Sequence, residues 1–249
     1  MIELKEISKT FNGKSILQNV SSIFETGHMN LVIGGSGSGK TVMMKCMVGL
    51  LEVDKGEILY DENVFSGLNR KERKPFREDI GMVFQGGALF DSLNVEKNVM
   101  FPLNMFTSMS MEEKRERVNF CLKRVNLVNV NNLTPSELSG GMKKRVAIAR
   151  AIAPNPKYLF CDEPNSGLDP QTSIVIDNLI KEITDEFNIT TIVNTHDMNT
   201  VLEVGDKILF LYRGEKWWEG NVNDILTTEN KELNDFIFAS RLAKNIKKV

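Results

Sequence analysis

The sequence predicts an α/β protein with a mainly parallel core sheet, an antiparallel β region near the N-terminus and an inserted helical region. Short apolar runs alternate with helical stretches toward both ends of the chain, a pattern typical of strands and crossover helices. Alternating apolar and polar residues before residue 33, interrupted by Asn12-Gly13, favour antiparallel strands joined by a turn. The stretch from about Val95 to Ala153 has only helical character, with Pro102 and Pro135 as expected breaks.

The core strands and helices follow in order along the chain. We expect strands at 29–33, 56–60, 80–84, 158–161, 190–193 and 207–212, and helices at 40–50 and 171–187. With no repeats and no Pro/Gly-rich linker, the chain is interpreted as one domain, 1–249. Its expected parts are a core (about 1–84 and 154–220), a helical lobe (about 86–153) and a helical tail (about 221–249).

Composition excludes several classes of protein. The chain has 249 residues, of which 31 are basic and 33 acidic, so the net charge of −2 gives no general attraction to nucleic acid. No apolar run is long enough to span a bilayer, and the first residues do not resemble a signal peptide. Three scattered cysteines form no disulfide or zinc pattern. A cytoplasmic location is therefore expected.

A glycine-rich loop follows the apolar run that ends at Ile33. It reads Gly34-Gly35-Ser36-Gly37-Ser38-Gly39-Lys40-Thr41 and satisfies the pattern G-x-x-x-x-G-K-[ST]. Glycines let the backbone wrap a phosphate closely; Lys40 would reach the β- and γ-phosphates, and the Thr41 hydroxyl would bind Mg²⁺. A flexible linker is the alternative, but the strand before the loop and the helix after it favour a site for ATP and Mg²⁺.

Two carboxylates follow the apolar strand 158–161. Because ligands bind at the carboxyl ends of parallel strands, we expect Asp162 to hold Mg²⁺ through water and Glu163 to polarise the attacking water. A solvated acidic strand end is the alternative. His196 follows another apolar strand and is expected to hydrogen-bond the γ-phosphate.

A second anion site is predicted about a hundred residues after the first. Ser139, Gly140 and Gly141 directly precede a helical stretch, where backbone N–H groups bind phosphate well. The sequence Leu-Ser-Gly-Gly resembles the signature of the ATP-binding-cassette (ABC) ATPases. Further matches occur in family order: the loop at 34–41, Gln85, the signature at 138–142, the acidic strand at 158–163, Ser166-Gly167-Leu168-Asp169, and His196.

The resemblance covers nearly the whole chain and implies a head-to-tail homodimer that encloses two ATP molecules. It implies that Glu163, His196 and Gln85 act in catalysis, and that Thr41, Gln85 and Asp162 hold Mg²⁺. Phe11 would stack on adenine, Ser139 to Gly141 would close on the partner's ATP, and Asp169 would lie along the dimer interface. The expected nucleotide-binding set is Phe11, Gly34, Gly35, Ser36, Gly37, Ser38, Gly39, Lys40, Thr41, Val42, Ser139, Gly140, Gly141 and Asp169. Met142, Val42 and Asn165 depart from the common family pattern.

The loop that starts at Gln85 and runs on to Leu103 is, together with Met142, similar to the ATPases of Mla-type phospholipid transporters. That resemblance implies a multi-span permease, a periplasmic MCE-domain substrate-binding protein, phospholipid cargo, and a place on the cytoplasmic face of the inner membrane. Lipoprotein-releasing, amino-acid and metal transporters share most of these motifs. A soluble ABC ATPase, such as a partner in Fe–S assembly, is the alternative from another class.

Two apolar segments have no assigned chemistry. A group of methionines and phenylalanines would line a groove for the permease or pack the helical lobe: Met100, Met105, Met109, Met111, Phe101 and Phe106. The tail from Leu233 is amphipathic enough for a helix against the core or a dimer partner, and includes Phe236, Leu242, Ile246 and Val249.

Overall fold

A computed structural model of the chain describes residues 1–238, which form two compact units. The first unit comprises Met1–Arg73 and the chain from Ile192, and the second comprises Lys74–Thr191. Residues 242, 246 and 249 of the predicted tail lie outside the described residues. No helix among residues 1–238 is long and apolar enough to cross a bilayer.

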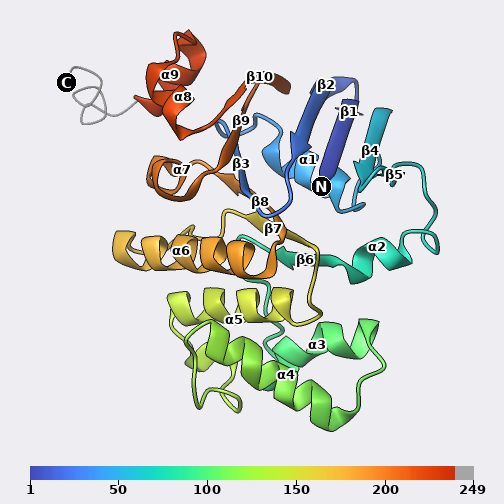
Figure 1. Cartoon of the computed structure of the whole chain (residues 1–249), viewed down its shortest axis with the longest axis vertical. Helices are drawn as coiled ribbons and strands as arrows, with labels where there is room; N and C mark the ends of the chain where they lie inside the picture. Colours follow the sequence, from blue (N-terminus) through green and yellow to red (C-terminus); the bar gives the residue numbers. More distant parts are fainter. Residues whose placement is uncertain (239–249) are drawn as a thin grey trace. The chain divides into compact units, whose positions relative to one another are not determined.

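The first unit contains an antiparallel sheet in the order β2-β1-β4-β5 (Figure 1). Its strands are β1 (Ile2–Phe11), β2 (Lys14–Phe24), β4 (Lys55–Tyr60) and β5 (Asn63–Val64). The turn at Asn12-Gly13 joins β1 to β2, as the sequence predicts, and both residues have positive φ. Alternate residues of β1 and β2, such as Ile2, Leu4 and Val20, are buried, which explains the alternating sequence pattern.

The core strands of the first unit include one parallel and one antiparallel pair. All five residues of β3 (Met29–Ile33) are buried, and β3 runs parallel to β9 (Lys207–Tyr212). Strand β10 (Glu215–Gly220) pairs antiparallel to β9. The remaining elements are β8 (Thr190–Thr195), which spans the boundary of the units, and the helices α1 (Lys40–Met47), α7 (Met198–Val204), α8 (Val222–Thr227) and α9 (Lys231–Ile237).

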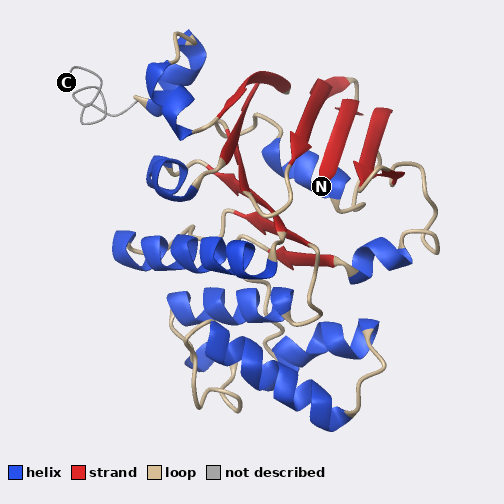
Figure 2. Cartoon of the chain, viewed as in Figure 1, coloured by secondary structure: helices blue, strands red, loops and turns tan. Residues whose placement is uncertain are grey.

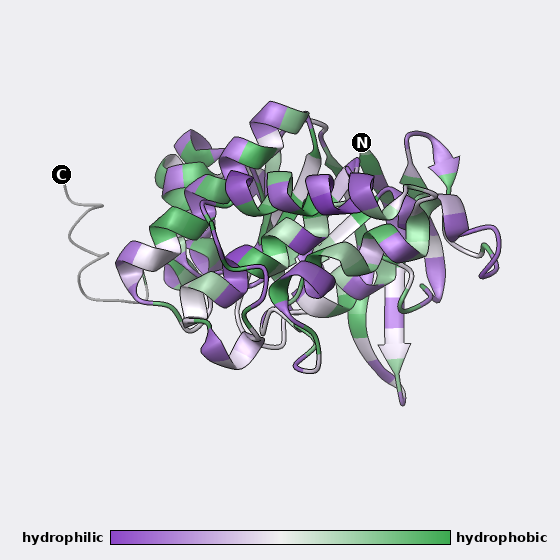
Figure 3. Cartoon of the chain, turned by 90° about the horizontal axis from the view of Figure 1, so that it is seen from below, coloured by the Kyte–Doolittle hydropathy of each residue, from purple (hydrophilic) through white to green (hydrophobic). Residues whose placement is uncertain are grey.

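The second unit is mostly helical, as Figure 2 shows. Strand β6 (Ile80–Val83) pairs parallel to β7 (Tyr158–Asp162). The helices are α2 (Lys74–Glu78), α3 (Val95–Phe106), α4 (Met111–Arg124), the 3₁₀ turn η1 (Pro135–Glu137), α5 (Gly140–Ile152) and α6 (Pro170–Phe187). Helices α3, α4 and α5 pack on one another, and the helical ribbons carry both hydrophilic and hydrophobic residues (Figure 3).

Local signals fix where these helices begin. Asn94, Ser110, Ser139 and Asp169 each accept a hydrogen bond from a backbone N–H in the first turn of the helix that follows. The predicted break at Pro135 is confirmed, because η1 starts there. The predicted break at Pro102 is wrong: α3 continues through it to Phe106, where Thr107 donates from its N–H and hydroxyl to the Leu103 carbonyl.

Together these elements confirm the predicted fold class. The chain has an antiparallel β region at its start, core strands that pair mainly in parallel, and a helical region inserted between β6 and β7.

Candidate functional site

The glycine-rich loop connects buried strand β3 to helix α1 in the first unit, as predicted. Gly37 and Gly39 have φ of 78° and 108°, which a residue with a Cβ adopts only with strain. At Gly34 an added Cβ would lie 2.3 Å from the Leu211 carbonyl oxygen. The loop can therefore pass this close to β9 only with glycine at position 34.

Lys40 turns back into this loop. Its side chain is buried, and its Nζ donates hydrogen bonds to the carbonyl oxygens of Gly34 at 2.7 Å and Gly35 at 3.2 Å. The Ser38 hydroxyl is buried with no hydrogen-bond partner among the described residues. A buried ammonium and an unsatisfied hydroxyl in a loop exposed from Gly35 to Gly37 fit a polyphosphate ligand, which supplies acceptor oxygens to both groups.

The other predicted site residues of the first unit lie at the ends of strands or in α1. Phe11 is the last residue of β1 and is 40% exposed, with the Lys9 ammonium 5.3 Å from its ring centre. Thr41 and Val42 are in the first turn of α1, and His196 is exposed directly after β8. Their roles in stacking, metal binding and phosphate binding stay predictions.

In the second unit the structure brings Gln85 and Glu163 together. The Gln85 Nε2 donates to the Glu163 carboxylate at 3.0 Å, and Asp162, just before Glu163, is the last residue of β7. Glu163 has φ of 47°, a left-handed conformation that is strained for a residue with a side chain. Such strain concentrates at functional sites, which is consistent with the catalytic role predicted for Glu163.

The second anion site lies at the N-terminus of α5, also in the second unit. The Ser139 hydroxyl accepts a hydrogen bond from the Met142 N–H at 3.2 Å, and Asp169 caps α6 by accepting from the Thr172 N–H and hydroxyl at 3.0 and 2.6 Å. An ideal Cβ on Gly141 would lie 2.9 Å from the Thr172 methyl group. The two helix starts border an open cavity of about 520 Å³ that Arg145 also lines. This cavity has the backbone donors and the cation that an anionic ligand needs.

The three predicted magnesium ligands, one in the first unit and two in the second, each have donor chemistry that suits Mg²⁺, and their joint binding of one ion stays a prediction. Thr41, Gln85 and Asp162 offer a hydroxyl, an amide and a carboxylate, which are the oxygen ligands that Mg²⁺ prefers. Residues 1–238 contain no group of three or more His, Cys, Asp and Glu side chains that could hold a metal ion. Protein sites for Mg²⁺ commonly use one or two carboxylates and complete the coordination with substrate phosphates and water. The residues present suit that mode.

Sequence reasoning missed two buried cations of α5. The Lys144 ammonium donates to the Gln85 carbonyl oxygen and is 3.5 Å from that of Glu163. The Arg150 guanidinium donates to the carbonyl oxygens of Gly87 at 2.6 Å and Ala88 at 2.7 Å. The sequence signal is their position: both fall on the face of α5 that buries Ala147 and Ala151, where a cation requires a partner.

An apolar groove of about 370 Å³ lies beside the loop that follows β6, also within the second unit. Six of the residues that line it are Phe84, Ala88, Phe90, Phe101, Met105 and Phe106. Of the predicted apolar group, Met100 is buried in the core instead, and Met109 and Met111 are exposed but are not among the lining residues. The packing interpretation is therefore confirmed for Met100, whereas Phe101, Met105 and Phe106 line a groove whose use by a permease stays a prediction.

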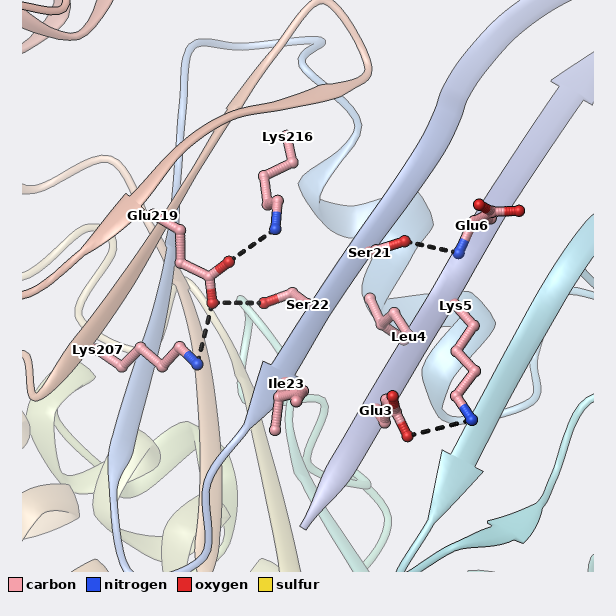
Figure 4. Close-up of a pocket in the computed structure, with 10 residues that line it drawn as sticks. All are labelled: Glu3, Leu4, Lys5, Glu6, Ser21, Ser22, Ile23, Lys207, Lys216 and Glu219. Carbon is pink, nitrogen blue, oxygen red and sulfur yellow. Dashed lines mark hydrogen bonds and ion pairs between the residues drawn. The ribbon is translucent and has the colours of Figure 1, made fainter.

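Another cavity, of about 660 Å³, lies in the first unit and contains none of the predicted site residues (Figure 4). Its main polar group is Glu219, which accepts from Ser22 at 3.1 Å and pairs with Lys207 at 3.0 Å and Lys216 at 2.9 Å. These contacts join β2 to β9 and β10. We interpret Glu219 as a residue that stabilises the packing of β2 against β9 and β10.

Comparisons with known proteins agree with this geometry. The family model described as ABC transporter matches residues 17–166. The chain is 37% identical over 248 residues to the methionine import ATP-binding protein MetN of Clostridium tetani, covering 98% of this chain and 77% of that protein. It is 40% identical over 257 residues to the chloroplastic protein TRIGALACTOSYLDIACYLGLYCEROL 3 of Arabidopsis thaliana, covering 96% of this chain and 74% of that protein.

Solved structures extend the likeness to three dimensions. A dimeric ATP-binding cassette in a post-hydrolysis state, bound to ADP and Pi, is 36% identical with a TM-score of 0.82, and the match covers 89% of this chain and 99% of that one. CbiO1 of Clostridium perfringens, part of an ABC transporter complex, is 29% identical with a TM-score of 0.85, covering 99% and 98%. The chain therefore belongs to the ABC transporter family, as an ATP-binding cassette that hydrolyses ATP with Mg²⁺.

Proposed function

We propose that this chain is the ATPase subunit of a transporter that moves phospholipids, working as a head-to-tail homodimer on a membrane permease. In this proposal Lys40 and the loop around it hold the phosphates of ATP, and Ser139, Gly140 and Gly141 contact the nucleotide bound by the second copy. Glu163, oriented by Gln85, polarises the attacking water. The observation that carries the ATPase assignment is the Gln85–Glu163 hydrogen bond of 3.0 Å next to the end of β7.

The apolar groove supports a membrane partner. Phe84 and Phe101 are 39% and 37% exposed, and Met105 is 58% exposed, so the groove presents apolar side chains to solvent. Exposed apolar grooves are suited to an amphipathic helix of a partner protein. The Arg150 guanidinium holds the carbonyl of Ala88, which lines the groove, and this same loop begins at Gln85. A permease segment in the groove would therefore press on the loop that orients Glu163.

A lipid cargo is supported by two likenesses, of which the first points to phospholipid. The loop at 85–103 together with Met142 resembles the Mla-type ATPases, which implies partners similar to their multi-span permease and MCE-domain protein. The Arabidopsis relative, 40% identical, carries the name of a galactolipid. The proposal places the chain on the cytoplasmic face of the inner membrane.

Import of methionine or a related amino acid is the second candidate function. Relatives from Clostridium tetani and Campylobacter jejuni, 37% and 36% identical, are named methionine import ATP-binding proteins. Their cargo would be small and water-soluble, so the two candidates differ in the partner proteins and in the bound small molecule.

Purification of the tagged chain from its native membranes in mild detergent separates these candidates. The proposal expects a multi-span protein, an MCE-domain protein and bound phospholipid at a constant molar ratio. A co-purified permease would contradict the lipid proposal if methionine stimulated ATP hydrolysis by the complex and no phospholipid were bound at a constant molar ratio. The ATPase assignment would still stand. Recovery with soluble partners alone would contradict both transport functions.

A matched pair of groove variants tests the docking site in the same preparation. Met105→Glu places a charge in the groove, whereas Met111→Glu places one at an equally exposed methionine outside it (58% and 54% exposed). We expect Met105→Glu to lower recovery of the permease by roughly tenfold or more, because an apolar interface does not tolerate an unpaired charge. Met111→Glu should leave recovery unchanged, and ATP binding should be unchanged in both variants.

A further inference from the structure

Lys144 has an unusual position for a lysine in a helix. It lies five residues after Ser139, in the second turn of α5, and is only 6% exposed. Buried ammonium groups are destabilising unless they are hydrogen-bonded, so a lysine here has to be explained by what it holds. Burial lowers the pKa of Lys144, while the Glu163 carboxylate opposes that shift.

The partners of Lys144 are the backbone carbonyls of the two residues whose side chains bond to each other. Its Nζ donates to the Gln85 carbonyl oxygen and lies 3.5 Å from the Glu163 carbonyl oxygen. The Gln85 amide in turn donates to the Glu163 carboxylate at 3.0 Å. One cation therefore ties together the backbones of both members of the pair.

The backbone at Glu163 needs such support. Its φ of 47° is a strained conformation, and strain of this kind persists only where surrounding contacts over-determine it. The Ser166 N–H donates to the Glu163 carbonyl at 3.2 Å, and Lys144 is the second group directed at that same oxygen. Loss of the ammonium would remove one of the groups that hold the turn at Glu163.

Helix α5 also binds the other end of the loop from Gln85 to Ala88. Arg150, six residues after Lys144, donates to the carbonyl oxygens of Gly87 and Ala88. The loop from Gln85 to Ala88 is thus bound to α5 at three carbonyl oxygens, and α5 begins at the Ser139 cap. A shift of α5 at Ser139 would be passed by Lys144 to Gln85 and Glu163.

We propose that Lys144 is a positioning residue for ATP hydrolysis, which sets the carboxylate of Glu163 relative to the attacking water and links it to the Ser139 end of α5. This inference rests on the proposed function, because it takes Glu163 as the group that polarises water. It predicts an effect on the rate of hydrolysis that is separate from nucleotide binding.

Three variants of the full chain test the proposal. Lys144→Met keeps the length and the apolar stem but removes the donors, and Lys144→Arg keeps donors of the same charge. Lys143→Met is the matched control, because Lys143 is the neighbouring cation of α5, is partly exposed, and has no side-chain hydrogen bond or ion pair among the described residues. For each protein we would measure kcat and KM for ATP, ATP binding at equilibrium, the melting temperature, and amide exchange at Ser166.

We expect Lys144→Met to lower kcat by on the order of 10- to 100-fold, as small misplacements of a catalytic group do, with KM and ATP binding within about twofold. Exchange at the Ser166 N–H should become faster, because its acceptor sits in the turn that Lys144 holds. Lys144→Arg should recover most of kcat, and Lys143→Met should match the wild type.

The outcomes separate this inference from the proposed function. A wild-type protein that does not hydrolyse ATP would overturn both. A wild type that hydrolyses ATP, with Lys144→Met at the same kcat, would overturn the positioning role alone. A variant whose lower melting temperature fully accounts for the loss, with no rescue by Lys144→Arg and unchanged exchange at Ser166, would also overturn it.

Discussion

The side-chain amide of Gln85 donates a hydrogen bond of 3.0 Å to the carboxylate of Glu163, although the two residues are 78 positions apart in the chain. The sheet explains this proximity. Gln85 follows β6, Glu163 follows β7, and these strands are parallel with Val83 opposite Cys161. Because the carboxyl ends of parallel strands lie at the same edge of a sheet, the side chains of Gln85 and Glu163 lie next to each other at that edge.

The two predicted anion sites should respond differently to mutation. Lys40→Ala removes a buried ammonium from the glycine-rich loop, so ATP binding to an isolated monomer should weaken by roughly 10- to 100-fold. Ser139→Ala should leave monomer binding unchanged and still abolish turnover, because in the proposed dimer Ser139 contacts nucleotide held by the second copy. Equilibrium titration of monomer with a fluorescent ATP analogue, alongside steady-state phosphate release, gives both quantities.

A different result would contradict the head-to-tail arrangement. If Ser139→Ala weakened binding to the monomer as much as Lys40→Ala does, both groups would be acting on the same nucleotide within one chain.

Gly34 should tolerate no side chain. An added Cβ would lie 2.3 Å from the Leu211 carbonyl oxygen and 2.7 Å from the Ser38 hydroxyl, and φ is 150°. Gly34→Ala should therefore lower the free energy of unfolding by about 2 kcal/mol, through overpacking against a backbone atom that cannot give way. Chemical denaturation measures this change.

Gly35 provides the control for that substitution. It is the adjacent loop glycine, and an added Cβ there would meet no atom within 4 Å. Equal destabilisation by Gly34→Ala and Gly35→Ala would show that loss of glycine flexibility, and not the approach to β9, sets the cost.

Glu219 should make stability depend on pH. Its burial raises the pKa of the carboxyl, but the hydrogen bonds from Lys216 and Lys207 outweigh burial and leave the pKa below its usual value. A carboxyl with a lowered folded-state pKa contributes stability above its unfolded-state pKa, and loses that stability as pH falls through the folded value. At pH 7, Glu219→Gln should lower the free energy of unfolding by about 1 kcal/mol.

This difference should shrink as the pH is lowered below about 4.5, because the carboxyl protonates first in the unfolded chain and then, at its lower pKa, in the folded protein, where it becomes neutral like glutamine. Glu203→Gln, at an exposed position of α7, is the control and should cost little at any pH. Urea denaturation of the three proteins at several pH values tests the prediction, and a constant cost of Glu219→Gln down to pH 3 would contradict it.

The sequence predicted most of the elements because their local signals agree with their burial. Strand β3 is a run of five buried apolar residues, and α3 to α6 each start at a side chain that caps the first turn, apart from the short η1. Pro102 shows the limit of such signals. Helix α3 continues through Pro102. The next residue, Leu103, is fully buried, and its tertiary packing outweighs the low helix propensity of proline.

The candidate site was predictable where chemistry depends on residue type and spacing, as in the loop at 34–41. Lys144 was not, because its proposed positioning role depends on burial and on which carbonyls it reaches. Neither property is visible in a run of basic residues such as Lys143-Lys144-Arg145, which resembles a solvated helix face. The sequence likewise could not show that Met105 lines the groove and Met100 is buried in the core, because this depends on which face of α3 packs against the rest of the unit.

Single-turnover hydrolysis by Glu163→Gln tests the central claim, that Glu163 polarises the attacking water, most directly. Glutamine preserves the size of the side chain, including its contact with Gln85, but cannot take a proton. We predict that the variant retains ATP, forms a stable dimer on a sizing column, and hydrolyses at least about 100-fold more slowly than wild type. Hydrolysis at the wild-type rate, with Glu182→Gln on the outer face of α6 as the control, would contradict the account.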